Sequence, residues 1–203
     1  LRGVFFYLYV FLDVYSRKIV GWQVYEQESS AWAAELVRDI VQREGLPHGQ
    51  VTLHSDNGGP MKGATMLATL QRLGIMPSFS RPAVSNDNPY SESLFKTLKY
   101  CPAYPEQPFS DLLAARQWVG QFVDWYNEQH RHSAIRFVTP AQRHAGQDKA
   151  LLAHRHEVYE KAKAQHPERW SGRTRNWHSV PIVYLNPDKS HHDHTGGTAK
   201  KAA

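Results

Sequence analysis

The sequence predicts an α/β fold in which a β-hairpin comes first and strands then alternate with helices. Two runs rich in valine, isoleucine, tyrosine and other β-prone residues, at residues 4–12 and 18–25, flank a turn at residues 13–17 and are typical of a hairpin. Downstream, segments with apolar residues at helical spacing alternate with short β-prone runs, which is the pattern of an α/β domain. The chain has 203 residues, 41% of them hydrophobic and 21% charged, so it can bury a core without disulfides or a structural metal.

The first segment after the hairpin is a predicted helix. Ser29 or Ser30 can cap its N-terminus, because a serine hydroxyl accepts a hydrogen bond from a free amide of the first turn. Apolar side chains recur at helical spacing from Trp32 to Val41, and Gly45 ends the helix.

A strand, a helix and a second strand come next. Residues 51–54 are β-prone and run into a strong turn signal at residues 55–60. Residues 66–73 supply one apolar helix face, and Gly74 ends that helix. Residues 75–80 form the second short strand of this pair.

Three further helices are predicted from residue 88 onwards. Asn88 is placed to cap the first of them, and Pro89 is suited to its first position because the proline φ angle is already helical. A long amphipathic helix begins at Ser110, and a further helical region begins at Thr139 and Pro140.

Charge is distributed unevenly along the chain. Residues 1–130 hold 11 basic and 13 acidic side chains, a net charge of −2, whereas residues 131–203 hold 13 basic and 6 acidic side chains, a net charge of +7. A basic C-terminal part on a nearly neutral body favours a polyanionic partner such as DNA or RNA, although a solvated tail would have the same composition.

Two further features of the composition limit the class of protein. The single cysteine, Cys101, excludes a disulfide scaffold and fits a reducing cytoplasm. The early apolar run at residues 4–12 is too short to span a membrane, which takes about 20 residues, so no membrane association is expected.

Two acidic side chains are candidates for a catalytic site. Asp56 follows a predicted strand and opens a glycine-rich turn, and functional groups in open α/β sheets gather at the C-terminal ends of strands. Glu92 lies one turn into the helix that Pro89 starts, and Lys96 and Lys99 follow it on the same helix face. Carboxylates beside amines can hold a divalent metal and guide a phosphate backbone. Residue types alone favour the alternative, in which Asp56 is a turn residue and Glu92 a surface residue.

The order of several short motifs changes that balance. Residues 55–58 followed by Glu92, with 35 residues between Asp56 and Glu92, resemble the catalytic core of DDE transposases and retroviral integrases, and Lys99 matches the basic residue that follows this glutamate in the family. Further motifs resemble the bacterial insertion-sequence branch, whose integrase core is often called OrfB. They lie at residues 12–22, 80–82, 86–89, 126–127, 131–133 and 139–141, with a weaker likeness at 169–172 and 183–187. Each motif is weak alone, but their common order and spacing are specific.

The resemblance implies an RNase H-like integrase core, with a mixed sheet that is antiparallel at its hairpin and has helices on both faces. The expected organisation is a catalytic core over residues 1–147, a basic C-terminal extension over residues 148–189 and a disordered tail over residues 190–203. The intact protein would be a transposase that cuts DNA at transposon ends and joins the freed 3′-hydroxyls to a target.

The same resemblance implies roles for individual residues and partners. Asp56 and Glu92 would be catalytic ligands of Mg²⁺ or Mn²⁺, and Lys96 and Lys99 would contact DNA. The expected partners are transposon-end and target DNA, further copies of the chain in a homo-oligomer on DNA, and an upstream helix-turn-helix transposase subunit. The expected location is the bacterial cytoplasm, at the nucleoid.

The chain departs from the family pattern at its first residues. The first aspartate of the family's catalytic triad normally lies on the first strand, before the hairpin turn and upstream of Leu1, and this chain is expected to open partway into that strand. Asp13 matches a different family aspartate, and we expect it to cap backbone amides in the hairpin turn. The chain is therefore expected to lack one of three metal-binding carboxylates, and the alternative function is an inactive truncated fragment that only binds DNA or a full-length partner.

Other polar residues have two interpretations each. His54 could face the site from the strand that ends at Asp56, but a structural role is favoured. The motifs at residues 126–127 and 131–132 could touch DNA phosphates, but a bracing role is favoured. Arg173 and Arg175 stand between two tryptophans, which suits DNA binding and equally a small packed β-element.

Overall fold

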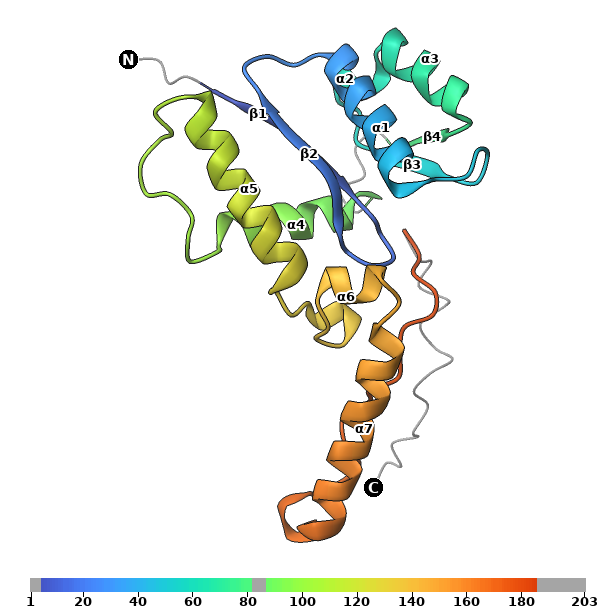
Figure 1. Ribbon diagram of the computed structural model, residues 1–203, viewed down its shortest axis with the longest axis vertical. Coiled ribbons are helices and arrows are strands. Elements are labelled where there is room, and N and C mark those ends of the chain that lie inside the picture. Colours follow the sequence, from blue (N-terminus) through green and yellow to red (C-terminus); the bar gives the residue numbers. More distant parts are fainter. Residues whose placement is uncertain (1–4, 82–86, 186–203) are drawn as a thin grey trace, which may run out of the picture.

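The computed structural model describes residues 5–81 and 87–185 and shows two pairs of strands surrounded by helices (Figure 1). Strands β1 (Tyr7–Leu12) and β2 (Ile19–Tyr25) pair antiparallel with an irregularity in register between Phe11 and Leu12, which confirms the predicted hairpin. Strands β3 (Thr52–Ser55) and β4 (Met76–Phe79) pair in parallel.

The strands differ from the predicted single mixed sheet in one respect. Antiparallel and parallel pairing both occur, but within residues 5–81 and 87–185 the two pairs do not hydrogen-bond to each other. Strands join one sheet only where two edges come within hydrogen-bonding distance, and the backbone pairing in the described residues stays within each pair.

The helices begin and end close to the local signals in the sequence. Ser29 caps α1, its hydroxyl accepting from the Ala31 amide at 3.2 Å, and Gly45 ends that helix in the left-handed conformation. Thr139 and Gln142 form a reciprocal capping box at α6. The helices are α1 (Ser30–Glu44), α2 (Gly59–Lys62), α3 (Ala64–Leu73), α4 (Pro89–Lys99), α5 (Leu112–Glu128), α6 (Pro140–His144) and α7 (Asp148–Gln165). None of the helices in the described ranges is long and apolar enough to cross a membrane.

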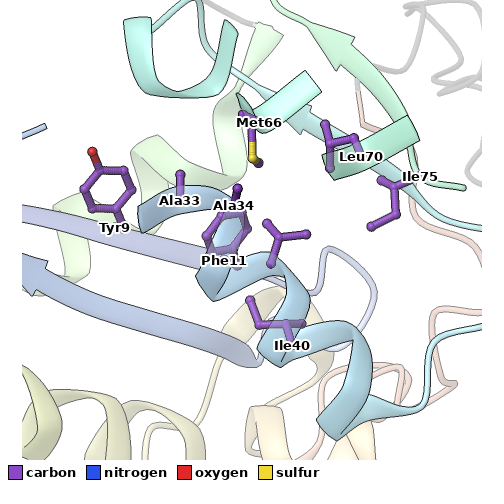
Figure 2. Close-up of a cluster of buried hydrophobic side chains, with 9 residues drawn as sticks. Tyr9, Phe11, Ala33, Ala34, Ile40, Met66, Leu70 and Ile75 are labelled. Atoms are coloured by element: carbon purple, nitrogen blue, oxygen red, sulfur yellow. The ribbon is translucent and has the colours of Figure 1, made fainter. Parts of the chain in front are cut away.

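Both faces of the hairpin are buried. Figure 2 shows the first cluster, in which Tyr9 and Phe11 of β1 lie against α1, α3 and Ile75. On the opposite face, a second cluster packs β2 residues such as Val24 against Leu94 of α4 and the apolar side of α5. Burial of apolar surface on both faces of the sheet is the main stabilising term of such a layered fold.

One buried side chain fixes the long helix α5 to the hairpin. The Asn127 Oδ1 accepts a hydrogen bond from the Ile19 amide at 2.9 Å, and its Nδ2 donates to the Ile19 carbonyl at 3.0 Å. Both backbone groups belong to the first residue of β2 and are buried. The favoured bracing role of residues 126–127 is therefore what the structure shows.

A third cluster lies at the C-terminal part of the described chain. Helix α7 extends away from the rest of the molecule, and the chain then turns and runs back beside it (Figure 1). The buried Trp177 of the returning chain packs with Ile135, Val138 and Leu152, and its ring meets the Tyr159 ring edge-on at 5.2 Å. Figure 1 and these contacts show an arm with its own small apolar core.

Candidate active site

Asp56 lies directly after β3, where the sequence analysis placed it. Its side chain is exposed, and Oδ1 accepts a hydrogen bond from the Gly58 amide at 3.1 Å. The neighbouring Asn57 donates from Nδ2 to the Ser80 carbonyl, just beyond β4, at 2.9 Å. This turn holds the carboxylate at the C-terminal end of a parallel strand pair, and the remaining lone pairs of the carboxylate stay available to a ligand.

His54 joins β3 to the chain that leads into α4. Its Nδ1 lies 3.0 Å from the Ser78 hydroxyl of β4, and its Nε2 lies 2.9 Å from the Asp87 carbonyl. Both ring nitrogens are engaged, so His54 has the structural role favoured from the sequence. This contact also brings the start of α4 next to the strand that carries Asp56.

An ion pair between Arg81 and Asp87 closes the same region. The Asp87 carboxylate is buried and accepts three hydrogen bonds from Arg81: from the backbone amide at 2.7 Å, from Nε at 2.9 Å and from Nη2 at 2.8 Å. A two-pronged guanidinium–carboxylate pair is both stronger and more directional than a single bond. It ties the end of β4 to the residue ahead of α4, and the sequence analysis missed it.

Helix α4 carries the other candidate residues on one exposed face. Glu92 is in its first turn, where a negative charge is favoured by the free amides of the helix N-terminus, and Lys96 and Lys99 follow towards the C-terminus. Asn88 occupies the predicted cap position and Pro89 the first helical position. The expected side-chain cap was wrong, because the Asn88 side chain makes no capping hydrogen bond.

The carboxylate oxygens of Asp56 and Glu92 are suitable ligands for a hard divalent cation. Both are exposed carboxylates, and the His54–Asp87 contact joins the strand that precedes Asp56 to the residues that lead into the helix carrying Glu92. The described part of the chain contains no group of three or more histidine, cysteine or carboxylate side chains placed to hold a metal. Two carboxylates are therefore available here, and a third is not among the described residues.

Asp13 does not supply that third ligand, because its carboxylate is used in the hairpin turn. It accepts hydrogen bonds from the Tyr15 amide at 3.1 Å, from the Ser16 amide at 3.2 Å and from the Ser16 hydroxyl. Burial alone would raise the pKa of Asp13, but these bonds and a contact to His144 hold the pKa below its usual value. His144 Nε2 also lies 2.9 Å from Glu44, so α6 is fixed to the turn and to α1.

The two arginines predicted to bind DNA lie in the C-terminal arm. Arg173 and Arg175 are exposed, and the Arg175 guanidinium lies over the rings of Phe137 and Trp177 at 5.0 and 5.7 Å. The chain around them has no described strand, so the packed β-element was wrong, and the tryptophan packs on α7 instead. The predicted tail over residues 190–203 lies outside the described residues.

Comparison with known proteins identifies the fold and the family. The sequence profile described as Integrase core domain matches residues 1–85, and a second profile with the same description matches residues 73–140. The chain belongs to the integrase core domain family. The two matches overlap over residues 73–85, and together they contain both Asp56 and Glu92.

Curated relatives of this integrase core are bacterial transposases. The chain is 34% identical over 138 residues to "Transposase for insertion sequence element IS904" of Lactococcus lactis, covering 66% of this chain and 53% of that protein. It is 29% identical over 137 residues to "Transposase InsF for insertion sequence IS3A" of Escherichia coli, covering 67% of this chain and 47% of that protein. The chain therefore spans about half the length of these relatives.

A solved structure shows the same fold. A chain in the cryoEM structure of the simian T-cell lymphotropic virus intasome in complex with PP2A regulatory subunit B56 gamma superposes with a TM-score of 0.53, at 17% identity over 66% of this chain and 46% of that chain. The integrase core is thus RNase H-like, as the resemblance implied.

Proposed function

We propose that the chain is the catalytic core of an insertion-sequence transposase and acts in metal-dependent DNA cleavage and strand transfer. The relatives named as insertion-sequence transposases support this function. The single observation that carries it is the 2.9 Å contact between His54 Nε2, two residues before Asp56, and the Asp87 carbonyl, two residues before the helix α4 that bears Glu92.

Asp56 and Glu92 would hold Mg²⁺ or Mn²⁺, with the third carboxylate coming from a residue ahead of Leu1 in a longer chain. When bound, such ions neutralise charge on the scissile phosphate and activate the attacking oxygen. The part of this chain is to keep the two carboxylates exposed at fixed elements, since the Asp56 carboxylate is oriented by the Gly58 amide and the Glu92 helix is tied down by Arg81 and Asp87.

DNA is the proposed substrate and partner. Lys96 and Lys99 continue the exposed face of α4 beyond Glu92 and would contact phosphates near the metal site. Arg173 and Arg175 would add phosphate contacts from the arm, in the basic extension over residues 148–189. We also propose assembly into a homo-oligomer on DNA, a helix-turn-helix subunit as a further partner, and a cytoplasmic location at the nucleoid.

The alternative, an inactive truncated fragment that only binds DNA or a full-length partner, is less well supported. The names of the relatives favour transposition. An RNase H-type nuclease without strand transfer is likewise disfavoured, because the motifs at residues 126–127 and 131–133 belong to the transposase pattern.

The deciding experiment replaces each carboxylate in a chain extended upstream to include the third acidic residue. Asp56→Asn and Glu92→Gln should each lower cleavage of transposon-end DNA by at least about a thousandfold, because a lost metal ligand removes several kcal/mol of charge stabilisation. Asp124→Asn, an exposed carboxylate on α5, is the matched control and should cleave normally. Circular dichroism checks that all three fold. Undiminished cleavage by either site variant would remove the metal-ligand assignment.

A further inference from the structure

The end of the described chain forms a strap that contacts the buried Arg143 directly and the buried Arg17 through Tyr90, whose ring stacks on Arg17. We use "strap" for residues 178–185, which run beside α6 towards the turn between β1 and β2 (Figure 1). Three side chains donate hydrogen bonds to strap carbonyls: Arg136 to His178 at 3.4 Å, Arg143 Nη2 to Val180 at 2.7 Å, and the Tyr90 hydroxyl to Tyr184.

The strap leaves large apolar side chains exposed. None of its residues belongs to a described strand, and Ile182 and Tyr184 remain 60% and 52% exposed. Isolated hydrogen bonds between side chains and carbonyls contribute little net stability each, because water replaces them when they open. Release of the strap is therefore a small change compared with unfolding of the core.

The arginine that the strap contacts and the arginine stacked on Tyr90 are both buried cations. Arg143 is 2% exposed and lies over the Tyr15 ring at 4.1 Å, and Arg17 is 8% exposed and lies over the Tyr90 ring at 3.9 Å. Nε and Nη1 of Arg17 and Nε of Arg143 are buried and have no hydrogen-bond partner in the described chain. A buried guanidinium without an anion is unfavourable, because the lost hydration is not replaced.

The positions of these cations indicate their ligand. Arg17 stacks on Tyr90, which lies two residues before Glu92 in the first turn of α4, and α4 also carries Lys96 and Lys99. A guanidinium fork matches the oxygens of a phosphodiester, with two parallel hydrogen bonds. An anion that reached both arginines would satisfy the buried nitrogens that the covered state leaves unpaired.

We propose that Arg17 and Arg143 form a binding site for the phosphodiester backbone of DNA, which the strap covers and which opens when the strap is displaced. The proposal rests on the proposed function in taking DNA as the ligand. It adds a backbone contact on the hairpin side of α4, and it makes the strap a competitor of DNA for this surface.

The test uses two truncated chains that differ by six uncharged residues. One lacks residues 186–203 and keeps the strap, and the other lacks residues 180–203 and loses Val180–Leu185. Binding of a short fluorescein-labelled duplex is measured by anisotropy over a series of salt concentrations, with EDTA present. Loss of the strap should tighten binding about tenfold and steepen the slope of log K against log salt by about one to two, since each phosphate contact contributes about 0.9. Equal affinity and slope in the two chains would overturn the proposal.

Arginine variants of the shorter chain show where the gain arises. Arg17→Asn, chosen because asparagine tolerates the positive φ of 69° at this position, and Arg143→Gln should each remove most of the gain. The exposed Arg38→Gln on α1 is the charge-matched control and should keep it. A gain that survives in both site variants would place the new contacts elsewhere and refute the site.

A labelling experiment avoids dependence on variants that fail to fold. Phenylglyoxal should modify Arg17 and Arg143 slowly while the strap is present and quickly without it, and the duplex should protect both, as mass spectrometry of peptides can show. Inorganic phosphate at the same phosphate concentration should protect neither, and equal protection by it would mean a free-anion site. These measurements involve no metal or cleavage, so their failure would leave the roles of Asp56 and Glu92 untouched, and the reverse also holds.

Discussion

Replacing Asn127 by leucine removes the two hydrogen bonds that fix α5 to the first residue of β2. The Ile19 amide and carbonyl, at 2.9 and 3.0 Å from the asparagine side chain, would both lose their buried partner. An unsatisfied buried polar group costs about 1–3 kcal/mol, so we expect the free energy of unfolding to fall by about 2–5 kcal/mol. For a chain of this size that corresponds to a drop in Tm of about 4–20 °C, since each kcal/mol shifts Tm by about 2–4 °C.

Urea unfolding followed by tryptophan fluorescence and far-UV circular dichroism measures this loss. The matched control is Glu128→Leu, the exposed neighbour on α5, which should change the free energy of unfolding by less than about 0.5 kcal/mol. If Asn127→Leu cost no more than the control, the two bonds would contribute nothing net, and the account of how α5 is anchored would be wrong.

Two further predictions concern pH and close packing. Burial, aided by the positive charge of Arg17 and by His130, lowers the pKa of His132 to about 4, so between pH 6.5 and 4 the unfolded chain binds a proton that the folded chain does not. The free energy of unfolding should therefore fall as pH falls through this window, by about 2 kcal/mol after allowance for the partial exposure of His132. Urea unfolding of His132→Asn should show a flatter pH dependence than that of the unchanged protein, and equal pH dependences of the two would contradict this. A Cβ added at Gly21 would lie 2.3 Å from Cδ1 of Ile40, so Gly21→Ala should lower the free energy of unfolding by about 1–3 kcal/mol. Adding Ile40→Val, which removes Cδ1, should recover part of that loss. An undiminished Tm for Gly21→Ala would refute the clash.

The elements that were predictable from the sequence are those fixed by neighbouring residues. The predicted bounds of the hairpin and of α1 agree with the structure to within a few residues, because their signals are local. These signals are the β-prone runs around a turn, the Ser29 cap, and Gly45 in the left-handed conformation. The side-chain cap predicted at Asn88 was wrong, because an asparagine at this position permits a capping hydrogen bond but does not require one.

Contacts between distant parts of the chain were not predictable in this way. The bond between Asn127 and Ile19 joins residues 108 apart, and no period or turn signal marks it. Arg17 and Arg143 are buried in the fold, whereas composition predicts exposed arginines. The ion pair between Arg81 and Asp87 joins opposite charges that lie six residues apart in the sequence. This spacing is only a weak signal, because it does not show that the two side chains meet.

The candidate site lies between these two cases. Asp56 at a strand end and Glu92 in a first helical turn follow from local signals, and the structure places both there. Their relation to each other depends on tertiary contacts such as the one between His54 and the Asp87 carbonyl ahead of α4, which the sequence did not reveal. Only the resemblance to integrases predicted that the two residues belong to one site, because a family pattern carries information on tertiary structure that a single sequence does not.

The fork between Arg81 and Asp87 makes the position of Glu92 depend on residues outside its own helix. Three hydrogen bonds join the end of β4 to the residue that leads into α4. Loss of either partner would release this connection without touching any candidate metal ligand, so a substitution at residue 81 or 87 could impair the site at a distance.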